Sequence, residues 1–315
     1  MPAITTTAPG KIILFGEHAV VYNRPAIAVP VTQVRAKATI TANLTGQAGE
    51  VQVVSKEIGL DSRLDNLPDD HAVVLAIRQV MEMLGVTHLP ALRLQISSTI
   101  PIAAGLGSGT AISVVIARAL SAFLGYPLED DQVSHIAYIV DQKHHGTPSG
   151  IDNTVIAYAQ PIFFIRGNPF ERLCPRQSFT LIIGHTGTAS PTVEAVGDVR
   201  RNWQADPATS ERIFDEIGSI ARDARRAIEN GAVEDLGPLM THNQALLREL
   251  TVSSAELDSL VDAALASGAS GAKLCGGGRG GNMIALAPPE NADAVAAALR
   301  AAGAVNTIIT RVGSD

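Results

Sequence analysis

The first third of the chain carries apolar residues in patterns that are typical of β-strands. Short apolar runs cover residues 12–15 and 26–31, and residues 34–44 alternate between apolar and polar positions. Alternation with a period of two puts every second side chain on one face of a sheet. Glycine and proline separate these runs, at Gly16, Pro25, Pro30 and the loop Gly46–Gly49. We therefore predict a β-rich beginning.

Helical spacing first appears at residues 72–84, where apolar side chains recur every three or four positions. The alternating segment 92–98 predicts a strand, and a glycine-rich run at 101–110 leads from it into a second helical pattern. A further helix is predicted over residues 131–144, and a strand over residues 161–165.

Residues 166–178 mix glycine, proline and charged side chains, as linkers do. We place a domain boundary here, between residues 1–172 and residues 173–315. Strand patterns follow at 179–183, 272–274, 282–287 and 306–310, and helical patterns at 192–203, 209–230, 233–249, 254–266 and 290–302. Because strands and helices do not alternate strictly, the expected fold class is α+β.

Composition excludes several classes of function. The chain has 315 residues, 46% hydrophobic content and a formal net charge of −7 at pH 7. The negative charge argues against nonspecific binding of nucleic acid or of an anionic membrane surface. The 4% aromatic content argues against a stacking platform for single-stranded nucleic acid. No disulfide framework, signal peptide or membrane span can be read, so we expect a soluble, cytoplasmic protein.

The glycine run Pro101-Ile-Ala-Ala-Gly-Leu-Gly-Ser-Gly-Thr110 stands between a predicted strand and a predicted helix. Its glycines let backbone N–H groups converge on an anion, and the N-terminus of a helix attracts negative charge. These features predict a phosphate site. An ordinary tight turn is the alternative that the loop by itself leaves open.

Two further stretches offer catalytic groups. Lys11 directly precedes an apolar strand, where a buried ammonium group can stabilise a developing alkoxide or neutralise a carboxylate. A lysine with its head in water is the alternative. Asp141 lies late in a predicted helix, and Asp152 follows the turn-rich segment 146–150. Of two such carboxylates, one can ligate Mg²⁺ and the other can accept a hydroxyl proton, unless both are solvated loop acids.

A third stretch, Gly271–Gly281, is so rich in glycine that we expect its backbone to approach another group closely. Arg279 within it is a candidate for contacting phosphate, or else it lies in a solvated turn. The stretch contains Gly-x-Gly-x-x-Gly, but a strand pattern follows where a dinucleotide-binding motif needs a helix. The sequence contains neither a Walker loop nor a metal site built from protein ligands alone.

Together and in this order, these motifs resemble those of the GHMP kinase superfamily. Within it, Ala8-Pro-Gly-Lys-Ile-Ile-Leu-Phe-Gly-Glu-His-Ala-Val-Val21 and His145-Gly-Thr-Pro-Ser-Gly-Ile-Asp-Asn153 are most similar to the mevalonate kinase family. The resemblance spans residues 8–281. It implies an α+β GHMP fold, with a ribosomal-S5-like, ATP-binding N-terminal domain (1–172), a ferredoxin-like C-terminal domain (173–315), and ATP between the two.

The resemblance also implies roles for individual residues. Asp152 matches the catalytic aspartate, and Lys11 matches the lysine beside it. Substrate-binding residues are expected at Glu17, His18, Gly277 and Gly278, and metal ligands at Ser108 and Asp141. The phosphates of ATP are expected on Pro101, Ala104, Gly105, Leu106, Gly107, Ser108, Gly109 and Thr110.

Three positions depart from the superfamily pattern. The second serine of Gly-Leu-Gly-Ser-Ser is replaced by Gly109, so Ser108 or Thr110 has to supply the hydroxyl for Mg²⁺. Asp141 stands where animal mevalonate kinases carry a glutamate, and its shorter side chain leaves room for a water molecule. Arg279 interrupts a loop that is usually glycine and alanine.

The activity implied by the resemblance is Mg²⁺-dependent transfer of phosphate from ATP to the 5-hydroxyl of mevalonate. The products would be 5-phosphomevalonate and ADP, in isoprenoid biosynthesis. Other acceptors within the superfamily remain open: phosphomevalonate, the 3-hydroxyl of mevalonate, and homoserine. A binding protein of the same fold without turnover is the alternative from another class. A homodimer is expected from the family.

Overall fold

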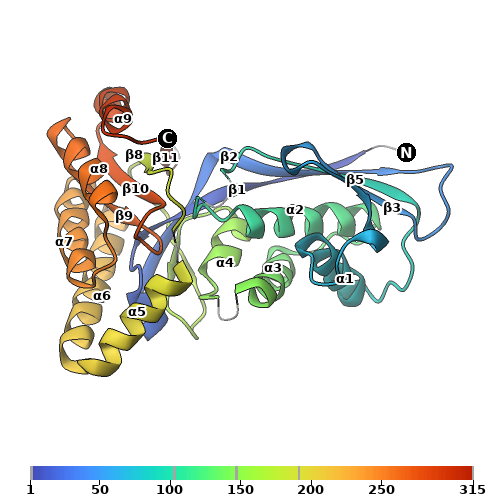
Figure 1. Ribbon diagram of the computed structural model, residues 1–315, viewed down its shortest axis with the longest axis horizontal. Helices are drawn as coiled ribbons and strands as arrows, with labels where there is room; N and C mark the ends of the chain where they lie inside the picture. The colour runs from blue at the N-terminus through green and yellow to red at the C-terminus, as the bar shows by residue number, and fades with distance from the viewer. Residues whose placement is uncertain (1–2, 102–103, 146–147, 191, 314–315) are drawn as a thin grey trace. The chain divides into compact units, whose positions relative to one another are not determined.

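The computed structural model describes residues 3–101, 104–145, 148–190 and 192–313 (Figure 1). The chain divides into two compact units, neither of which is continuous in sequence. Unit 1 comprises residues 1–10, 34–101 and 107–159, and unit 2 comprises residues 11–33, 102–106 and 160–315. The long strands β1 (Ile4–Phe15) and β2 (Ala26–Ala42) contribute to both units. A domain boundary at residues 172–173 stays a prediction.

Unit 1 is a sheet with helices on one of its faces (Figure 1). The strand order is β4 (Leu60–Arg63), β3 (Val51–Ser55), β5 (Leu92–Ser98), β2, with β1 paired to β2. The helices are α1 (Ala72–Leu84), α2 (Ser108–Phe123), α3 (Asp130–His145) and α4 (Ile151–Tyr158). Helix α2 contacts α1, α3, α4 and β5, so the helix that follows the glycine loop is central to this core.

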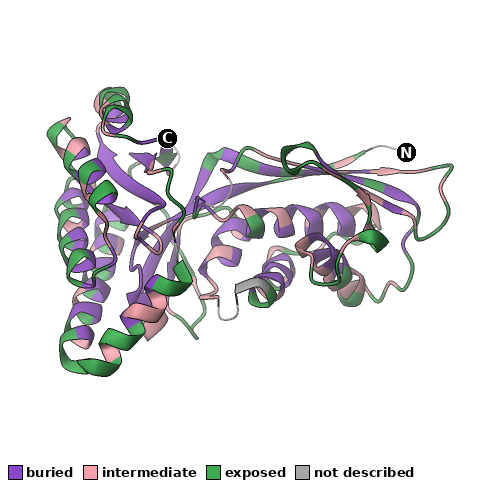
Figure 2. Ribbon diagram, in the orientation of Figure 1, coloured by how far each residue is buried: buried purple, intermediate pink, exposed green. Residues whose placement is uncertain are grey.

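Unit 2 contains an antiparallel sheet that we name the C-terminal sheet, with the order β11 (Asn306–Val312), β8 (Phe179–His185), β10 (Asn282–Ala287), β9 (Gly271–Cys275). Its helices are α5 (Thr192–Ala205), α6 (Pro207–Asn230), α7 (Leu236–Glu249), α8 (Ala255–Ala266) and α9 (Ala292–Ala301). In the same unit, residues 26–28 of β2 pair with β6 (Ile162–Phe164), which pairs with β7 (Glu171–Arg172). Figure 2 shows strands β9 and β10 of the C-terminal sheet buried and the outer sides of α6 and α7 exposed.

The two faces of the C-terminal sheet differ in what they contact. A side chain at Gly184 would touch Leu299 of α9, so the face that carries Gly184 and its cross-strand neighbour Met283 is the helix-covered face. Successive residues of a strand point to opposite faces. Lys273 and Cys275 therefore lie on the other face, together with Asn282, which pairs directly with Cys275. We call this second face the Lys273 face.

Several elements differ from the sequence-based expectation. β2 runs without a break through Pro30, which lies between the residues that pair with β6 and those that pair with β5. The missing N–H therefore removes no bond from either of these pairings. β1 begins at Ile4 rather than at residue 12, and α4 forms after the expected turn at 146–150, where we predicted no element. α4 has only eight residues and begins after Gly150, whose φ is 91°.

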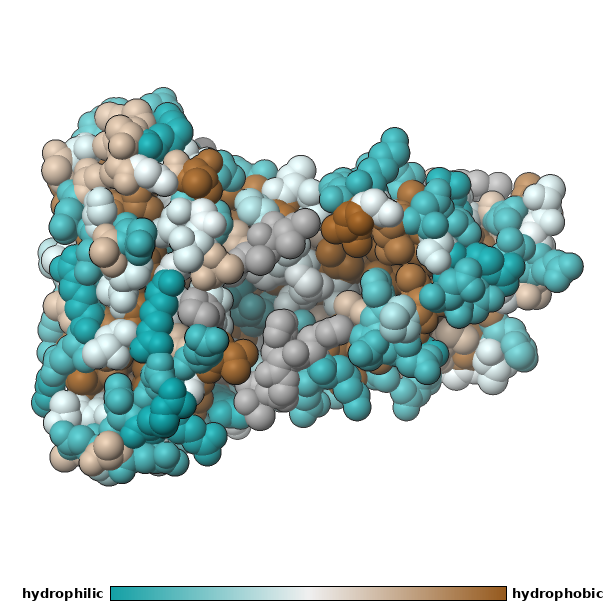
Figure 3. Space-filling model, in the orientation of Figure 1, coloured by the Kyte–Doolittle hydropathy of each residue, from teal (hydrophilic) through white to brown (hydrophobic). Residues whose placement is uncertain are grey.

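No helix among the described residues combines the length and the apolar character that crossing a bilayer requires. Hydrophilic side chains predominate over the outer helices α6 and α7 on the face shown in Figure 3. Both cysteines are free thiols, Cys174 exposed and Cys275 buried.

Candidate active site

The lysine motif lies in unit 2, on the second half of β1. Lys11 is only 6% exposed, so the alternative of an ammonium group in water is wrong. Its backbone N–H donates to the carbonyl of Leu106 at 2.9 Å, which joins the lysine strand to the glycine loop. A buried ammonium group has to be balanced by nearby anions or by a ligand.

The turn after β1 places Glu17 and His18. Gly16 has a φ of +97°, and a Cβ there would lie 2.5 Å from the Cα of Ala26, so the turn requires glycine. His18 has a φ of 61°, which is strained for a residue with a side chain. The helical turn Ala19–Tyr22 follows. It packs against α6, because the ring of Tyr22 stacks on that of Phe214 in α6 with centroids 4.1 Å apart.

Glu17 is fully buried and forms an ion pair with Lys273, which is also fully buried. The Lys273 Nζ donates to Oε1 of Glu17 and, at 2.7 Å, to the carbonyl of Leu274. Oε2 of Glu17 has no hydrogen-bond partner among the described residues. Burial raises the pKa of Glu17, while the positive charges of Lys273 and, more weakly, Lys11 lower it.

Sequence reasoning missed Lys273. The signal was present, because Lys273 is the one charged residue within the apolar strand pattern at 272–274. A strand of the C-terminal sheet that is buried at every position leaves no solvent for an ammonium group. Its partner, however, is 256 residues away in the chain, so spacing offered no means of identifying it.

His18 is held as a neutral ring. Burial, together with the charges of Arg279 and Lys273, lowers the pKa of His18 to about 4, against the opposing effect of the carbonyl of Gly277. His18 Nε2 lies 3.1 Å from that carbonyl oxygen, which can only accept, so Nε2 carries the proton. In the neutral ring Nδ1 is then an acceptor. His18 and Gly277, both expected in a substrate pocket, are thus brought together.

The lowered pKa of His18 predicts a loss of stability in acid. The unfolded chain takes up a proton below about pH 6.5, whereas the folded chain does so only near pH 4. The stabilisation is therefore complete above pH 6.5 and is lost as the pH falls towards 4, by up to roughly 3 kcal/mol. Urea unfolding at a series of pH values should show a smaller acid loss in a His18→Asn variant, since asparagine tolerates positive φ. Parallel curves for the two proteins would contradict the assignment.

The glycines of the 276–281 loop are needed because other backbone and side-chain atoms occupy the space of a Cβ. A Cβ at Gly278 would lie 2.0 Å from the carbonyl oxygen of Val252, and a Cβ at Gly277 would lie 2.7 Å from Oγ1 of Thr192. Arg279, with a φ of 57°, pairs with Asp198 of α5 and donates from Nε to the carbonyl of Thr251 at 3.3 Å. The arginine thus ties this loop to α5, which a solvated turn would not do.

Two other residues of the Lys273 face contact β1, the strand that carries Lys11, and the glycine loop at residues 101–110. The thiol of Cys275 donates to the carbonyl of Ile13 at 3.3 Å, and burial raises the pKa of this thiol to about 11. The side-chain nitrogen of Asn282 donates to the carbonyl of Ala104. Because that carbonyl can only accept, the amide orientation of Asn282 is fixed. Asn282 is a second site residue that the sequence did not reveal.

The glycine loop has the backbone expected of an anion site. Gly105 and Gly107 have φ angles of 72° and 76°, and Gly107 is the N-cap residue of α2. α2 begins at Ser108, so its first N–H groups have no partner within the helix. A Cβ at Gly109 would meet nothing within 4 Å. Ile102 and Ala103 lie outside the described residues.

The carboxylates of unit 1 lie on two helices. Asp141 is late in α3, as predicted, and is buried, with its Oδ2 accepting from the hydroxyl of Thr110 at 2.8 Å. Asp152 is in the first turn of α4, where the helix dipole favours a negative charge. Thr110 thus lies beside Asp141, the expected metal ligand. No cluster of three or more His, Cys, Asp or Glu residues that could hold a metal occurs among the described residues.

The predicted residues are therefore distributed over both units. Unit 2 holds Lys11, Glu17, His18, Gly277 and Gly278. Unit 1 holds Pro101, Gly107, Ser108, Gly109, Thr110, Asp141 and Asp152, and Ala104, Gly105 and Leu106 belong to unit 2. The juxtaposition of Lys11 and Asp152 stays a prediction.

Two family models match this chain, one in its N-terminal half and one in its C-terminal half. Residues 71–160 match the GHMP kinases N terminal domain, and residues 224–305 match the GHMP kinases C terminal family. Mevalonate kinase of Pyrococcus abyssi is 34% identical over 332 aligned residues, which cover 99% of this chain and 96% of that protein.

Solved structures agree with the sequence comparison. The crystal structure of L. major mevalonate kinase in complex with R-mevalonate superposes with a TM-score of 0.85 at 30% identity and covers 99% of this chain and 96% of the other. The crystal structure of the Methanococcus jannaschii mevalonate kinase gives a TM-score of 0.84 at 28% identity, over 100% and 99% of the two chains. The predicted α+β fold of two GHMP domains is confirmed.

Proposed function

This chain belongs to the GHMP kinase family, and we propose that it transfers the γ-phosphate of ATP to the 5-hydroxyl of mevalonate, giving 5-phosphomevalonate and ADP. The observation that carries this proposal is the similarity to mevalonate kinases along nearly the entire chain. The burial of Lys11 supports it, because an ammonium group without solvent can act on a reacting hydroxyl.

The residues present fit ATP and Mg²⁺. The left-handed glycines Gly105 and Gly107 and the N-terminus of α2 offer backbone N–H groups for the phosphates. Asp141 and the hydroxyl groups of Ser108 and Thr110 are hard oxygen donors of the kind that Mg²⁺ prefers. When bound, the metal neutralises charge on the β- and γ-phosphates.

In the proposed mechanism, Asp152 accepts the proton of the attacking hydroxyl or orients it. Lys11 stabilises the negative charge that develops on the same oxygen. Catalysis of phosphoryl transfer consists largely of positioning and electrostatic stabilisation, so these two side chains carry most of what the protein contributes to the chemical step.

Glu17, His18, Gly277 and Gly278 are the proposed pocket for the rest of the alcohol. In unit 2 the ammonium groups of Lys11 and Lys273 both act on the carboxylate of Glu17, and His18 is neutral. Positive charges beside this pocket suit the carboxylate of mevalonate. The unprotonated Nδ1 of His18 suits a hydroxyl donor.

Restoring the missing serine should strengthen metal binding. A Gly109→Ser side chain would enter open space on a helical backbone and add an oxygen beside Ser108. We expect the Mg²⁺ concentration for half-maximal ADP release to fall by about tenfold, because one more oxygen becomes available. Gly109→Ala is the matched control, since it fills the same space without the oxygen. Equal Mg²⁺ dependence of the two variants would contradict the prediction.

A coupled ADP-release assay tests the proposed function directly. The purified chain is given ATP with mevalonate, phosphomevalonate or homoserine, each with and without Mg²⁺. We expect rapid Mg²⁺-dependent ADP release with mevalonate, and ³¹P NMR should show the phosphate on the 5-oxygen. A 3-phosphate product, or a preference for another acceptor, would replace the substrate assignment. Tight ATP binding without ADP release on any acceptor would instead identify a binding protein.

A cytoplasmic location and a homodimer are part of the same proposal. The location rests on composition, and the dimer rests on the family. Sedimentation of the purified chain would establish its oligomeric state.

A further inference from the structure

Arg279 holds a backbone conformation that favours glycine. Its φ is 57°, in the left-handed region where a Cβ is strained, and residues 276–281 are otherwise all glycine. A glycine at this position would remove the strain, so an arginine there needs contacts that compensate for it. The function proposed above gives this side chain no role, and its contacts therefore have to explain its presence.

Arg279 binds the end of α7 through both its backbone and its side chain. α7 ends in a Schellman motif, in which Thr251 has a φ of 61° and the N–H of Val252 donates to the carbonyl of Leu247 at 3.2 Å. The backbone N–H of Arg279 donates to the carbonyl of Val252 at 2.8 Å, and its Nε donates to that of Thr251 at 3.3 Å. The helix dipole also favours a cation at this end of α7.

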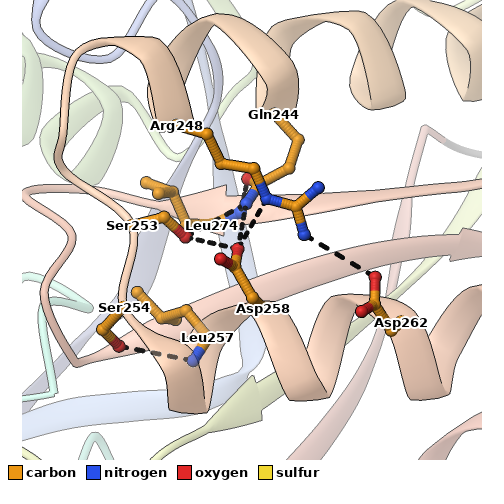
Figure 4. A network of polar contacts seen from close by, with 8 residues as sticks. All are labelled: Gln244, Arg248, Ser253, Ser254, Leu257, Asp258, Asp262 and Leu274. Carbon is orange, nitrogen blue, oxygen red and sulfur yellow. Dashed lines mark hydrogen bonds and ion pairs between the residues drawn. The ribbon is translucent and has the colours of Figure 1, made fainter.

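The end of α7 that Arg279 binds is itself held by a polar network (Figure 4). Asp258 of α8 accepts hydrogen bonds from two residues of α7, Gln244 at 3.1 Å and Arg248 at 2.8 Å. Oε1 of Gln244 accepts from the N–H of Leu274 in β9 at 2.8 Å. These bonds tie the end of α7 to α8 and to the C-terminal sheet, so Arg279 is attached to a firm support.

Helix α5 contacts both His18 and the loop carbonyl that His18 binds, in each case through a neighbouring residue. Asp198 of α5 forms an ion pair with Arg279, which lies two residues after that carbonyl in the loop. Further along α5, the ring of Trp203 lies 5.4 Å from that of Tyr22, in the helical turn that follows His18. The two partners of the hydrogen bond are thus held from the same helix.

We propose that Arg279 is a positioning residue that holds the carbonyl of Gly277 against Nε2 of His18. Its bonds to Asp198 and Thr251 fix the loop in which that carbonyl lies. Nδ1 of the ring then remains an acceptor for a hydroxyl group of the bound alcohol. Without Arg279 the carbonyl would move, and the ring would also populate the tautomer whose Nδ1 carries the proton and cannot accept. The inference rests on the function proposed above, which places mevalonate beside His18.

The charge of Arg279 acts in the same direction as its position. Burial lowers the pKa of His18 most, the carbonyl of Gly277 opposes this effect, and the positive charges of Arg279 and Lys273 lower the pKa further. A protonated ring would donate from both nitrogens. By disfavouring that state, Arg279 helps to keep one nitrogen of His18 as an acceptor.

The first measurement observes the ring and needs no substrate. In the parent protein labelled with ¹⁵N-histidine, long-range ¹H–¹⁵N spectra should show His18 with a protonated Nε2 and a bare Nδ1. The loss of these signals in His18→Asn assigns them. In Arg279→Asn, whose new residue tolerates a positive φ, the two nitrogen signals should move towards each other as both tautomers become populated. Unchanged signals in this variant would overturn the inference.

The second measurement is the affinity for mevalonate, determined by calorimetry without ATP, together with steady-state kinetics. For Arg279→Asn we expect the dissociation constant and the KM of mevalonate to rise by about tenfold, the value of one hydrogen bond, while kcat and the KM of ATP change far less. A rise in the KM of ATP alone would instead assign Arg279 to a phosphate group and overturn the inference.

Asp198→Asn breaks the same connection from the other side. It should shift the tautomer and the affinity for mevalonate in the same direction as Arg279→Asn, and the double variant should be no worse than Arg279→Asn alone. Because Asp198 lies on the partly exposed side of the pair, this variant keeps the test decisive even where Arg279→Asn does not fold. Fully additive effects would mean that the two residues act separately, against the proposal.

Arg201→Met is the matched control. Arg201 pairs with the same Asp198 but lies on α5 itself, three residues away, so its loss leaves the loop attached to α5. The tautomer of His18 and the affinity for mevalonate should stay as in the parent. A purely structural role for Arg279 would lower the unfolding temperature of Arg279→Asn and leave the tautomer and the affinity unchanged, which would contradict the proposal.

The parent enzyme is assayed first, so that the two hypotheses can fail separately. Absence of ADP release from the parent with mevalonate would refute the proposed function, while the spectra of His18 would still decide whether Arg279 holds the ring. An active parent whose tautomer and mevalonate affinity are the same in Arg279→Asn would refute only the role of Arg279.

Discussion

Replacing Asp152 with asparagine is expected to lower kcat with mevalonate by roughly 10²–10⁴, the usual contribution of a positioned general base. The amide keeps the shape of the side chain but cannot take a proton. Asp152 is in the first turn of α4. Asparagine is also accepted near a helix N-terminus, so the fold should survive. Substrate affinity should change far less than kcat, which steady-state kinetics over a range of mevalonate concentrations would establish.

Asp131→Asn is a suitable control for this variant. Asp131 also stands in the first turn of a helix, α3, but is exposed and has no proposed role. The Asp131→Asn variant should therefore retain the parent kcat. An Asp152→Asn enzyme that works at the parent rate would mean that the hydroxyl needs no base from this position, and the assignment of Asp152 would fall.

The pattern of apolar residues within a segment was enough to predict several of the helices and strands. The helix at Ala72–Leu84 was predicted with its observed bounds, because its apolar side chains recur at helical spacing and Gly85 ends it in a left-handed conformation. α2, α3 and the strands of the C-terminal sheet were likewise found to within a few residues. In the helices the pattern reflects one buried face, whereas β9 and β10 were recognised as short apolar runs that are buried at every position.

Elements that depend on distant partners could not be predicted in this way. β3 and β4 are short and joined through a polar turn, and β3 is fixed by parallel pairing to β5, which lies about forty residues later in the sequence. α4 is too short to show a helical period. From the sequence, either Ser108 or Thr110 had to supply the hydroxyl of the missing serine. Only the structure shows that the hydroxyl of Thr110 donates a hydrogen bond to Asp141.

The same limit applies to the site in unit 2. Motifs along the chain identified Lys11, Glu17 and His18. Lys273 stood out only as a charge within an apolar strand pattern, with nothing in the sequence to identify its partner, and Asn282 matched no pattern. Both lie on the Lys273 face, where alternate positions of β9 and β10 meet the lysine strand and the glycine loop. The C-terminal glycine motif therefore contributes residues to the candidate site from β9 and β10, the strands on either side of it, as well as from its loop.

Replacing Lys11 with methionine should lower kcat by roughly 10²–10³, the cost of removing one preorganised group that stabilises developing charge. Methionine has nearly the same length and suits a buried position. The fold should tolerate the change, because Glu17 keeps its ion pair with Lys273 and is not left as an uncompensated buried carboxylate. The measurement is kcat at saturating ATP, Mg²⁺ and mevalonate, with the unfolding temperature recorded for the same protein.

The comparison with Lys37→Met separates the chemistry of Lys11 from the general loss of a positive charge. Lys37 is exposed on β2, so its replacement should affect neither kcat nor stability. Lys11→Arg should not restore the parent rate, because the guanidinium group is larger and spreads its charge over a plane, while the site is built for a compact ammonium group. If Lys11→Met kept the parent kcat while lowering the unfolding temperature, Lys11 would be a structural cation only.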